Sequence, residues 1–159
     1  MRQTRLGLSE NARKASISIL QTTLSDALSL RLAVKQAHWT VRGPHFQQLH
    51  ELFDSFVAPL DAEIDEVAER IATLGGTPDG RVEAVAQAAG LARYPFEAIT
   101  GTDHLTALAE RFAGLGNTAR DGINAADNAG DADTADLLTA TSRFLDQSLW
   151  ILEAHLDGK

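Results

Sequence analysis

The sequence of 159 residues contains no cysteine. This absence excludes disulfide bonds, iron–sulfur clusters, thiolate metal sites and cysteine nucleophiles. Any metal site must therefore use imidazole, carboxylate, backbone or water ligands, which favours iron, manganese or zinc over copper(I).

Long apolar runs are also missing. The longest candidates, such as Leu149-Trp150-Ile151-Leu152, fall far short of the roughly 20 residues that a membrane helix needs. No apolar block follows the charged N-terminus, so the sequence predicts no secretory signal. We expect a cytoplasmic protein with no membrane partner and a single domain, the default at this length.

Positive charge is scarce: 14 Lys and Arg stand against 22 Asp and Glu, a formal net charge of −8. Binding to phosphate backbones needs clustered Lys and Arg, so this balance argues against a general nucleic-acid binder. The same charge would concentrate cations near any acidic opening.

Apolar residues recur at helical spacing along most of the chain. The first predicted helix starts after an N-cap at Ser9 and ends near Trp39. Three more long helices are predicted at about 45–74, 102–127 and 132–157, with a short helix at 82–89.

Pro59 interrupts the second helix. Proline removes a backbone hydrogen bond and costs about 3 kcal/mol inside a helix if nothing compensates. The chain could form two shorter helices that meet at Pro59. The apolar stripe keeps its phase across the proline, so we predict one bent helix.

Four long helices with a long second-to-third connection indicate an all-α, ferritin-like four-helix bundle, whose crossover runs along the bundle. Residues 1–8 are predicted to form a flexible arm and residues 9–157 the single bundle domain.

Metal-ligand residue types lie on one face of the second helix. His50 and Asp54 are one turn apart, and so are Asp65 and Glu69. The two pairs share nearly the same face, but about 16 Å of helix separates them. His38, at the end of the first helix, can fold back towards His50.

Metal–ligand bonds are only about 2.0–2.2 Å long, so one ion cannot join both pairs within one chain. An antiparallel two-fold dimer would bring each His/His/Asp half opposite its partner's Asp/Glu half. Spacing alone leaves this interpretation about level with ordinary solvated surface pairs.

Several strings resemble the signature of the Dps family, the mini-ferritins known as DNA-binding proteins from starved cells. They are His38-Trp39-Thr40-Val41-Arg42-Gly43, Leu49-His50-Glu51-Leu52-Phe53-Asp54, Asp65-Glu66-Val67-Ala68-Glu69-Arg70, Leu74-Gly75-Gly76, Ala129-Gly130-Asp131, Thr134-Ala135-Asp136 and Ser148-Leu149-Trp150. The resemblance covers nearly the whole chain, in order and without large gaps.

The resemblance implies a hollow homo-dodecamer that oxidises Fe(II), typically with hydrogen peroxide, and stores the ferric mineral. His38, His50 and Asp54 match ligands from one subunit, and Asp65 and Glu69 match ligands from its neighbour. Ordinary ferritins complete the site within one subunit with a Glu-x-x-His, which is absent here.

Three further residues take roles from the resemblance. Trp39 would sit near the iron site and intercept radicals, although an interface aromatic is an equal alternative. Asp127 and Asp136 would line an acidic three-fold pore that guides Fe(II) inward, where helix capping is the simpler alternative.

Other candidate ligands are set aside. Glu51 and Asp61 point off the shared face, and His45, His104 and His155 match no ligand position. We interpret them as surface or core residues.

DNA binding is predicted to be weak or absent, because the arm carries only Arg2 and Arg5 and salt would screen them. Twelve copies could add avidity, and a nucleoid-associated location stays open. Two alternatives to ferroxidase function remain: a nucleoid-binding structural protein with minor iron chemistry, and a non-storing di-metal enzyme, which would need a complete ligand set in one chain.

Overall fold

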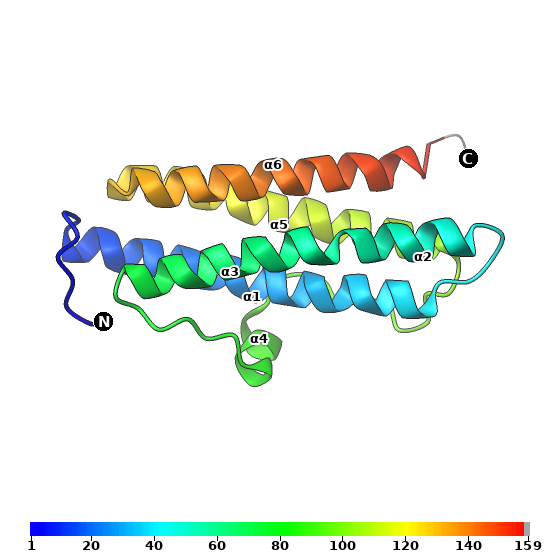
Figure 1. The fold of residues 1–159 in the computed structure, drawn as a ribbon, viewed down its shortest axis with the longest axis horizontal. Helices are drawn as coiled ribbons and strands as arrows, with labels where there is room; N and C mark the ends of the chain where they lie inside the picture. The colour runs from blue at the N-terminus through cyan, green and yellow to red at the C-terminus, as the bar shows by residue number, and fades with distance from the viewer. Residues whose placement is uncertain (158–159) are drawn as a thin grey trace.

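The computed structural model describes residues 1–157. Within them the helices are α1 (Glu10–Thr40), α2 (Phe46–Ser55), α3 (Val57–Thr73), α4 (Val82–Ala88), α5 (Gly101–Ala129) and α6 (Ala132–Ala154). Helices α1, α5, α6 and the end-to-end pair α2–α3 form a four-rod bundle, and α4 lies outside it against α1 (Figure 1). This confirms the predicted ferritin-like bundle with a short helix in its long connection.

The second rod bends at Phe56, three residues before Pro59. Proline has no N–H to donate to the carbonyl of Ser55, and its ring crowds that carbonyl. The chain adjusts there, and Phe56 N donates to Phe53 O at 3.3 Å in a tighter turn. The predicted bend is present, and it falls where Pro59 removes the hydrogen bond.

Side chains cap the helices that the sequence predicted. The Ser9 hydroxyl accepts a hydrogen bond from Ala12 N at 3.1 Å. Thr100 and Asp103 form a reciprocal capping box, so α5 begins slightly earlier than predicted. Helix α6 ends at Ala154, a little short of the predicted end.

Polar side chains of α1 fasten the long connection. The Gln21 amide donates to Asp79 O at 3.0 Å and accepts from Asp79 N at 2.9 Å. The carboxylate of Asp26, only 2% exposed, accepts from Gly90 N at 2.6 Å. The crossover is therefore held along the outside of α1.

The N-terminal arm is anchored near its start. Arg2 N donates to Gly75 O at 2.7 Å, and its guanidinium donates to Ala72 O at 3.1 Å. Ala72 lies in the last turn of α3 and Gly75 just after it, where helices leave carbonyl acceptors without a helical partner. Gly75 has φ +90°, and a Cβ there would lie 2.6 Å from Arg2 O, so only glycine admits this contact.

The core fills the space between the rods, with Phe53, Phe112 and Leu145 among its fully buried side chains. In the described part of the chain, no helix is long and apolar enough to cross a membrane.

A buried ion pair joins α3 to the junction between α5 and α6. The Arg70 guanidinium donates to Asp131 Oδ1 at 2.6 Å, and Asp131, 1% exposed, accepts from Thr134 N as the N-cap of α6. Burial tends to raise the pKa of Asp131, but the bonds from Thr134 and the charge of Arg70 outweigh it and hold the pKa below its usual value.

We predict that Arg70→Met lowers the free energy of unfolding by about 3 kcal/mol or more, because it leaves the Asp131 carboxylate buried without its cation. Arg120→Met is the matched control, since Arg120 pairs with Asp146 at the exposed surface, where a pair contributes less than about 1 kcal/mol. Thermal unfolding of the two variants beside the parent measures the difference.

Low pH should remove the difference in unfolding free energy between these two variants. The folded pKa of Asp131 is lowered, so its contribution is complete at neutral pH and is lost as the pH falls below about 4. Equal losses for both variants at neutral pH would contradict a stabilising role for the Arg70 pair.

Candidate metal centre

The turn between α1 and α2 brings three predicted ligands together. Gly43, at φ +119°, reverses the chain, so that the end of α1 lies beside α2. The depression between them has a volume of about 420 Å³ and is lined by His38, Gln47, His50, Glu51, Asp54 and Ser55. Within one chain, the three residues predicted as one half of a metal site therefore line the same depression.

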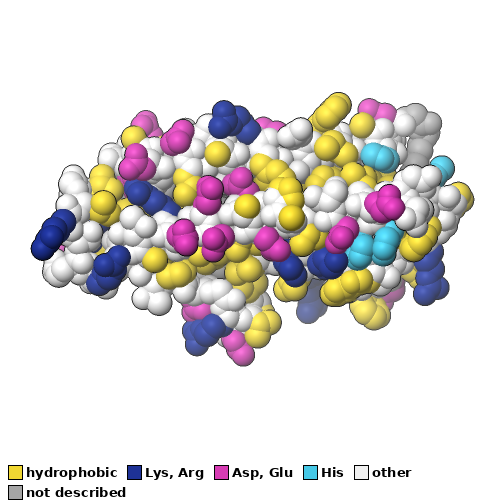
Figure 2. Space-filling model, viewed as in Figure 1, with side chains coloured by type: hydrophobic (Ala, Val, Ile, Leu, Met, Phe, Trp, Pro, Cys, Tyr) yellow, Lys and Arg dark blue, Asp and Glu magenta, His cyan; other side chains and the backbone are white. Residues whose placement is uncertain are grey.

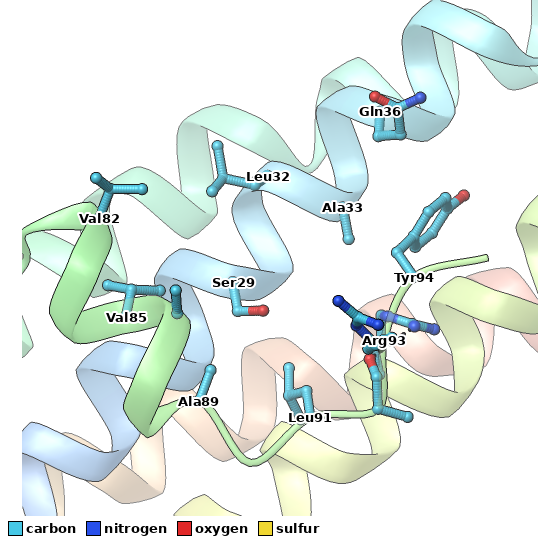
Figure 3. A pocket seen from close by; sticks show the side chains of 13 residues that line it. Ser29, Leu32, Ala33, Gln36, Val82, Val85, Ala89, Leu91, Arg93 and Tyr94 are labelled. Atoms are coloured by element: carbon cyan, nitrogen blue, oxygen red, sulfur yellow. Dashed lines mark hydrogen bonds between the residues drawn. The ribbon is translucent and has the colours of Figure 1, made fainter. Parts of the chain in front are cut away.

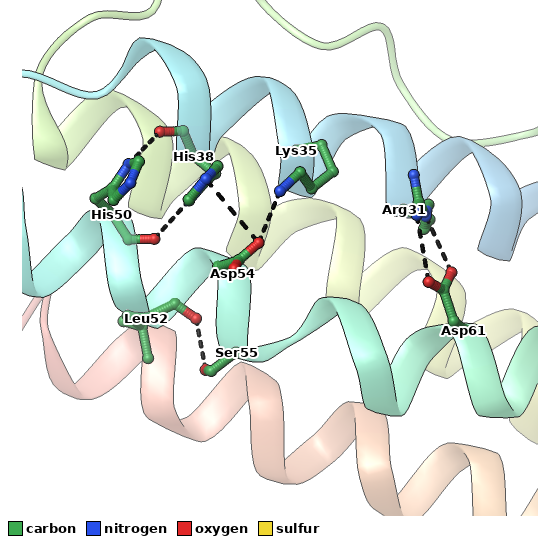
Figure 4. A network of polar contacts seen from close by, with 8 residues as sticks. All are labelled: Arg31, Lys35, His38, His50, Leu52, Asp54, Ser55 and Asp61. Carbon is green, nitrogen blue, oxygen red and sulfur yellow. Dashed lines mark hydrogen bonds and ion pairs between the residues drawn. The ribbon is translucent and has the colours of Figure 1, made fainter.

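Each histidine is oriented by the backbone of the other. His38 Nδ1 lies 2.7 Å from His50 O, and His50 Nδ1 lies 2.8 Å from His38 O (Figure 4). A carbonyl oxygen only accepts, so both Nδ1 atoms carry the proton. In the neutral form of each ring, Nε2 then keeps a free lone pair, the arrangement that metal-binding histidines use.

The two rings are stacked, with centroids 3.7 Å apart and an angle of 19° between planes. An imidazole lone pair lies in its ring plane. One ion about 2.1 Å from both Nε2 atoms would lie outside at least one plane. The stacking therefore favours two metal positions over one shared ion.

Lys35 already places a cation on the third ligand. Its ammonium lies 2.7 Å from Asp54 Oδ1, the oxygen that lies 4.0 Å from His38 Nε2. The hydrogen bond from Lys35 lowers the pKa of Asp54, which keeps the carboxylate ionised. Sequence reasoning missed Lys35, although it precedes His38 by one helical turn and so shares its face.

The donor set fits a borderline divalent metal. Two neutral imidazole nitrogens and one carboxylate suit iron, manganese or zinc. The ammonium of Lys35 is a stand-in cation beside the same carboxylate, which supports the fit.

The other predicted half lies on α3. Asp65 and Glu69 are both exposed. On the face in Figure 2, acidic side chains follow α3, and histidines lie further along over α1 and α2. Within residues 1–157 no group of three or more His, Asp and Glu is close enough to hold an ion. One chain thus brings His38, His50 and Asp54 together without a complete ligand set.

Glu51 and Asp61, which the sequence analysis did not count as ligands, lie in different surroundings. Glu51 lines the depression and accepts a hydrogen bond from Gln47, which helical angle alone did not suggest. Asp61 accepts from Arg31 at 2.9 Å on the surface, as an ordinary ion pair (Figure 4).

The remaining histidines lie away from this depression. His104 is fully buried at 0% exposure, whereas His45 and His155 are exposed. His155 Nδ1 lies 2.7 Å from the carbonyl of Ile151, one turn back in α6. None of the three lines the depression between α1 and α2.

The candidate residues outside the ligand set are exposed. Trp39 is 66% exposed, with Lys35 Nζ 5.7 Å from its ring centre. Asp127 and Asp136 are exposed beside the α5–α6 junction. Their neighbour Asp131 is instead buried and caps the start of α6.

Known proteins resemble this chain in fold and in sequence over nearly its whole length. The ferritin family, described as a ferritin-like domain, matches residues 17–158. The DNA protection during starvation protein of Agrobacterium fabrum is 45% identical over 157 residues, which cover 99% of this chain and 97% of that protein.

Solved structures of Dps proteins show the same similarity. The Dps of Mycobacterium smegmatis, in a tetragonal crystal form, superposes with a TM-score of 0.94 at 35% identity and covers 99% of this chain and 95% of its own. The Dps of Vibrio cholerae, described as a member of a broad superfamily of ferritin-like diiron-carboxylate proteins, has a TM-score of 0.92 at 27% identity, with coverage of 99% and 98%.

We predict that Lys35→Met strengthens binding of Zn(II) or Co(II) at this depression by a few-fold, because the metal no longer displaces an ammonium from Asp54. Arg31→Met is the control: it removes the neighbouring cation of α1, which pairs with Asp61 instead. Calorimetric titration of the metal-free proteins measures both. Unchanged affinity in Lys35→Met would show that the ammonium does not compete with the metal.

Proposed function

This chain belongs to the Dps family of ferritin-like proteins, and we propose that it oxidises Fe(II) with hydrogen peroxide and stores the ferric product. The observation that carries the proposal is the reciprocal pairing of His38 and His50, because it leaves two oriented Nε2 lone pairs beside an ionised carboxylate. The family itself supports iron storage and protection of DNA.

The complete site would form between subunits. Among residues 1–157 no further ligand completes the His/His/Asp half, and Asp65 and Glu69 are exposed on α3, where they could face a second copy. A two-fold axis that pairs the halves generates two equivalent sites from one interface. Assembly is then a condition of the chemistry.

Two Fe(II) ions per site fit the stacked imidazoles, one for each Nε2. Each ion gives one electron, and together they reduce one peroxide to two waters with two protons. Because the two ions supply both electrons that one peroxide needs, no hydroxyl radical is released. His38, His50 and Asp54 bind and orient the substrate ions, and the exposed ring of Trp39 would intercept radicals that leave the site.

Storage requires a shell and an entrance. We propose a homo-dodecamer in which Asp127 and Asp136 line an acidic pore at the three-fold axis. Their exposure beside the α5–α6 junction and the net charge of −8 per chain support the attraction of Fe(II) to such an opening. A cytoplasmic location, where Fe(II) and peroxide meet, suits this activity.

DNA binding would be weak or absent. The arm offers two arginines, and the guanidinium of Arg2 is engaged with Ala72 O. This contact favours protection of DNA by removal of iron and peroxide rather than by coating it. The alternative of a nucleoid-binding structural protein has no comparable support.

A mixing experiment tests the shared site. One variant, His38→Ala with Asp54→Ala, lacks the first half, and another, Asp65→Ala with Glu69→Ala, lacks the second. Each alone should lose peroxide-dependent Fe(II) oxidation. In a mixed dimer one of the two sites regains both intact halves, so random refolding together should restore about a quarter of the parent activity.

Glu66→Ala is the control, since Glu66 is also an exposed carboxylate of α3, and it should keep full activity. Size measurement checks that every variant assembles. No recovery on mixing would argue against sites shared between chains, and full activity in either double variant would remove its residues from the site.

The arm has its own test. A gel shift at physiological salt should show no DNA complex for the intact protein, and removal of residues 1–8 should change nothing. Weak binding at low ionic strength should disappear as salt rises, because few phosphates are neutralised. A salt-resistant complex that depends on residues 1–8 would instead support the nucleoid-binding alternative.

A further inference from the structure

Tyr94, the single tyrosine of the chain, is paired with a buried histidine. It lies on the connection between α4 and α5, at the wall of a cavity of about 420 Å³ (Figure 3). Its hydroxyl lies 2.5 Å from Nδ1 of His104, which is 0% exposed. The two rings are nearly parallel, with 13° between planes.

The hydrogen bonds define where each proton sits. The Thr40 hydroxyl donates to Gln36 O at 2.6 Å, so its oxygen can accept from His104 Nε2, 3.4 Å away. His104 then carries its proton on Nε2 and accepts from Tyr94 at Nδ1. Burial supports this state, because it lowers the pKa of His104 and raises the pKa of Tyr94.

The pair lies directly behind the metal-binding half. Thr40, which contacts His104, follows His38 by two residues on α1. Phe53, which meets the His104 ring edge-on with centroids 6.2 Å apart, immediately precedes Asp54 on α2. His104 thus packs against both helices that supply the ligands.

We propose that the Tyr94–His104 pair donates one electron to peroxide chemistry when the metal site can supply only one. This rests on the proposed ferroxidase function. Reduction of H₂O₂ to two waters takes two electrons and two protons. One Fe(II) gives the first electron, Tyr94 gives the second, and the two protons come from solvent.

The phenolic proton does not leave the pair. As Tyr94 loses its electron, the O–H bond breaks and the proton moves to His104 Nδ1, which leaves a neutral phenoxyl radical and an imidazolium. The neighbouring Asp103 charge favours that imidazolium. A later electron from a soluble reductant, with the same proton returned, restores Tyr94.

Nearby positive charges explain why Tyr94 is a better electron donor here than Trp39. The Lys35 ammonium lies over the Trp39 ring and opposes a positive radical on it. The Arg111 guanidinium, 4.9 Å from the Tyr94 ring, would oppose a charged radical in the same way. Tyr94 avoids that penalty because transfer of its proton keeps the ring neutral.

The first experiment uses the assembled protein with limiting Fe(II) and excess peroxide, freeze-quenched for electron paramagnetic resonance. A tyrosyl signal is expected, and a single tyrosine makes its assignment unambiguous. Tyr94→Phe should abolish the signal, and Trp39→Phe should keep it. A parent without the signal, while Fe(II) is still oxidised, overturns the proposed link to peroxide chemistry.

The second experiment tests the pair without iron. A photogenerated ruthenium(III) polypyridyl complex oxidises the metal-free protein, and the yield of tyrosyl radical should stay constant across neutral pH. His104→Gln keeps a hydrogen-bond acceptor but cannot take the proton, so it should lower the yield. Equal yields in the parent and this variant, at equal size and helix content, would refute the pairing.

The two arms separate the possible failures. If Fe(II) oxidation itself is absent, the proposed function fails, and the photochemical result still decides whether Tyr94 and His104 act as a redox pair.

Discussion

The exchange of hydrogen bonds between His38 and His50 is the contact on which the proposed metal-binding half depends. Each Nδ1 is held by the other residue's carbonyl, at 2.7 and 2.8 Å. This joins the end of α1 to the start of α2 and selects the Nδ1–H tautomer for both rings. The free Nε2 atoms, the stacking and the approach to Asp54 all follow from it.

Charges around this half are balanced before any metal arrives. Lys35 on α1 pairs with Asp54. Arg31, one turn before Lys35 on α1, pairs with Asp61 in the same way. Such exposed pairs contribute little to stability. In the proposed site, a divalent ion would replace the ammonium of Lys35 on Asp54, whose carboxylate is already ionised.

The bundle explains why we propose a metal site that is shared between two chains. The second rod is long, so its His end and its Asp65/Glu69 end are separated by about 16 Å, and the bend at Phe56 does not bring them into one cluster. Arg70 ties the acidic end to the buried Asp131, which fixes α3 against the α5–α6 junction. In the proposed assembly, a symmetric partner would complete the site without any motion within one chain.

Local periodicity determined the helices and placed His50 and Asp54 on one face, because a helix converts sequence spacing into position on a face. The predicted turn after the first helix placed His38 near them, and the family resemblance selected these three residues as ligands. Other features depended on contacts between segments far apart in sequence: the engagement of Asp54 by Lys35, the anchoring of Arg2 at α3, and the burial of His104 against Tyr94. No spacing rule encodes these, because they arise only once separate helices and connections pack together.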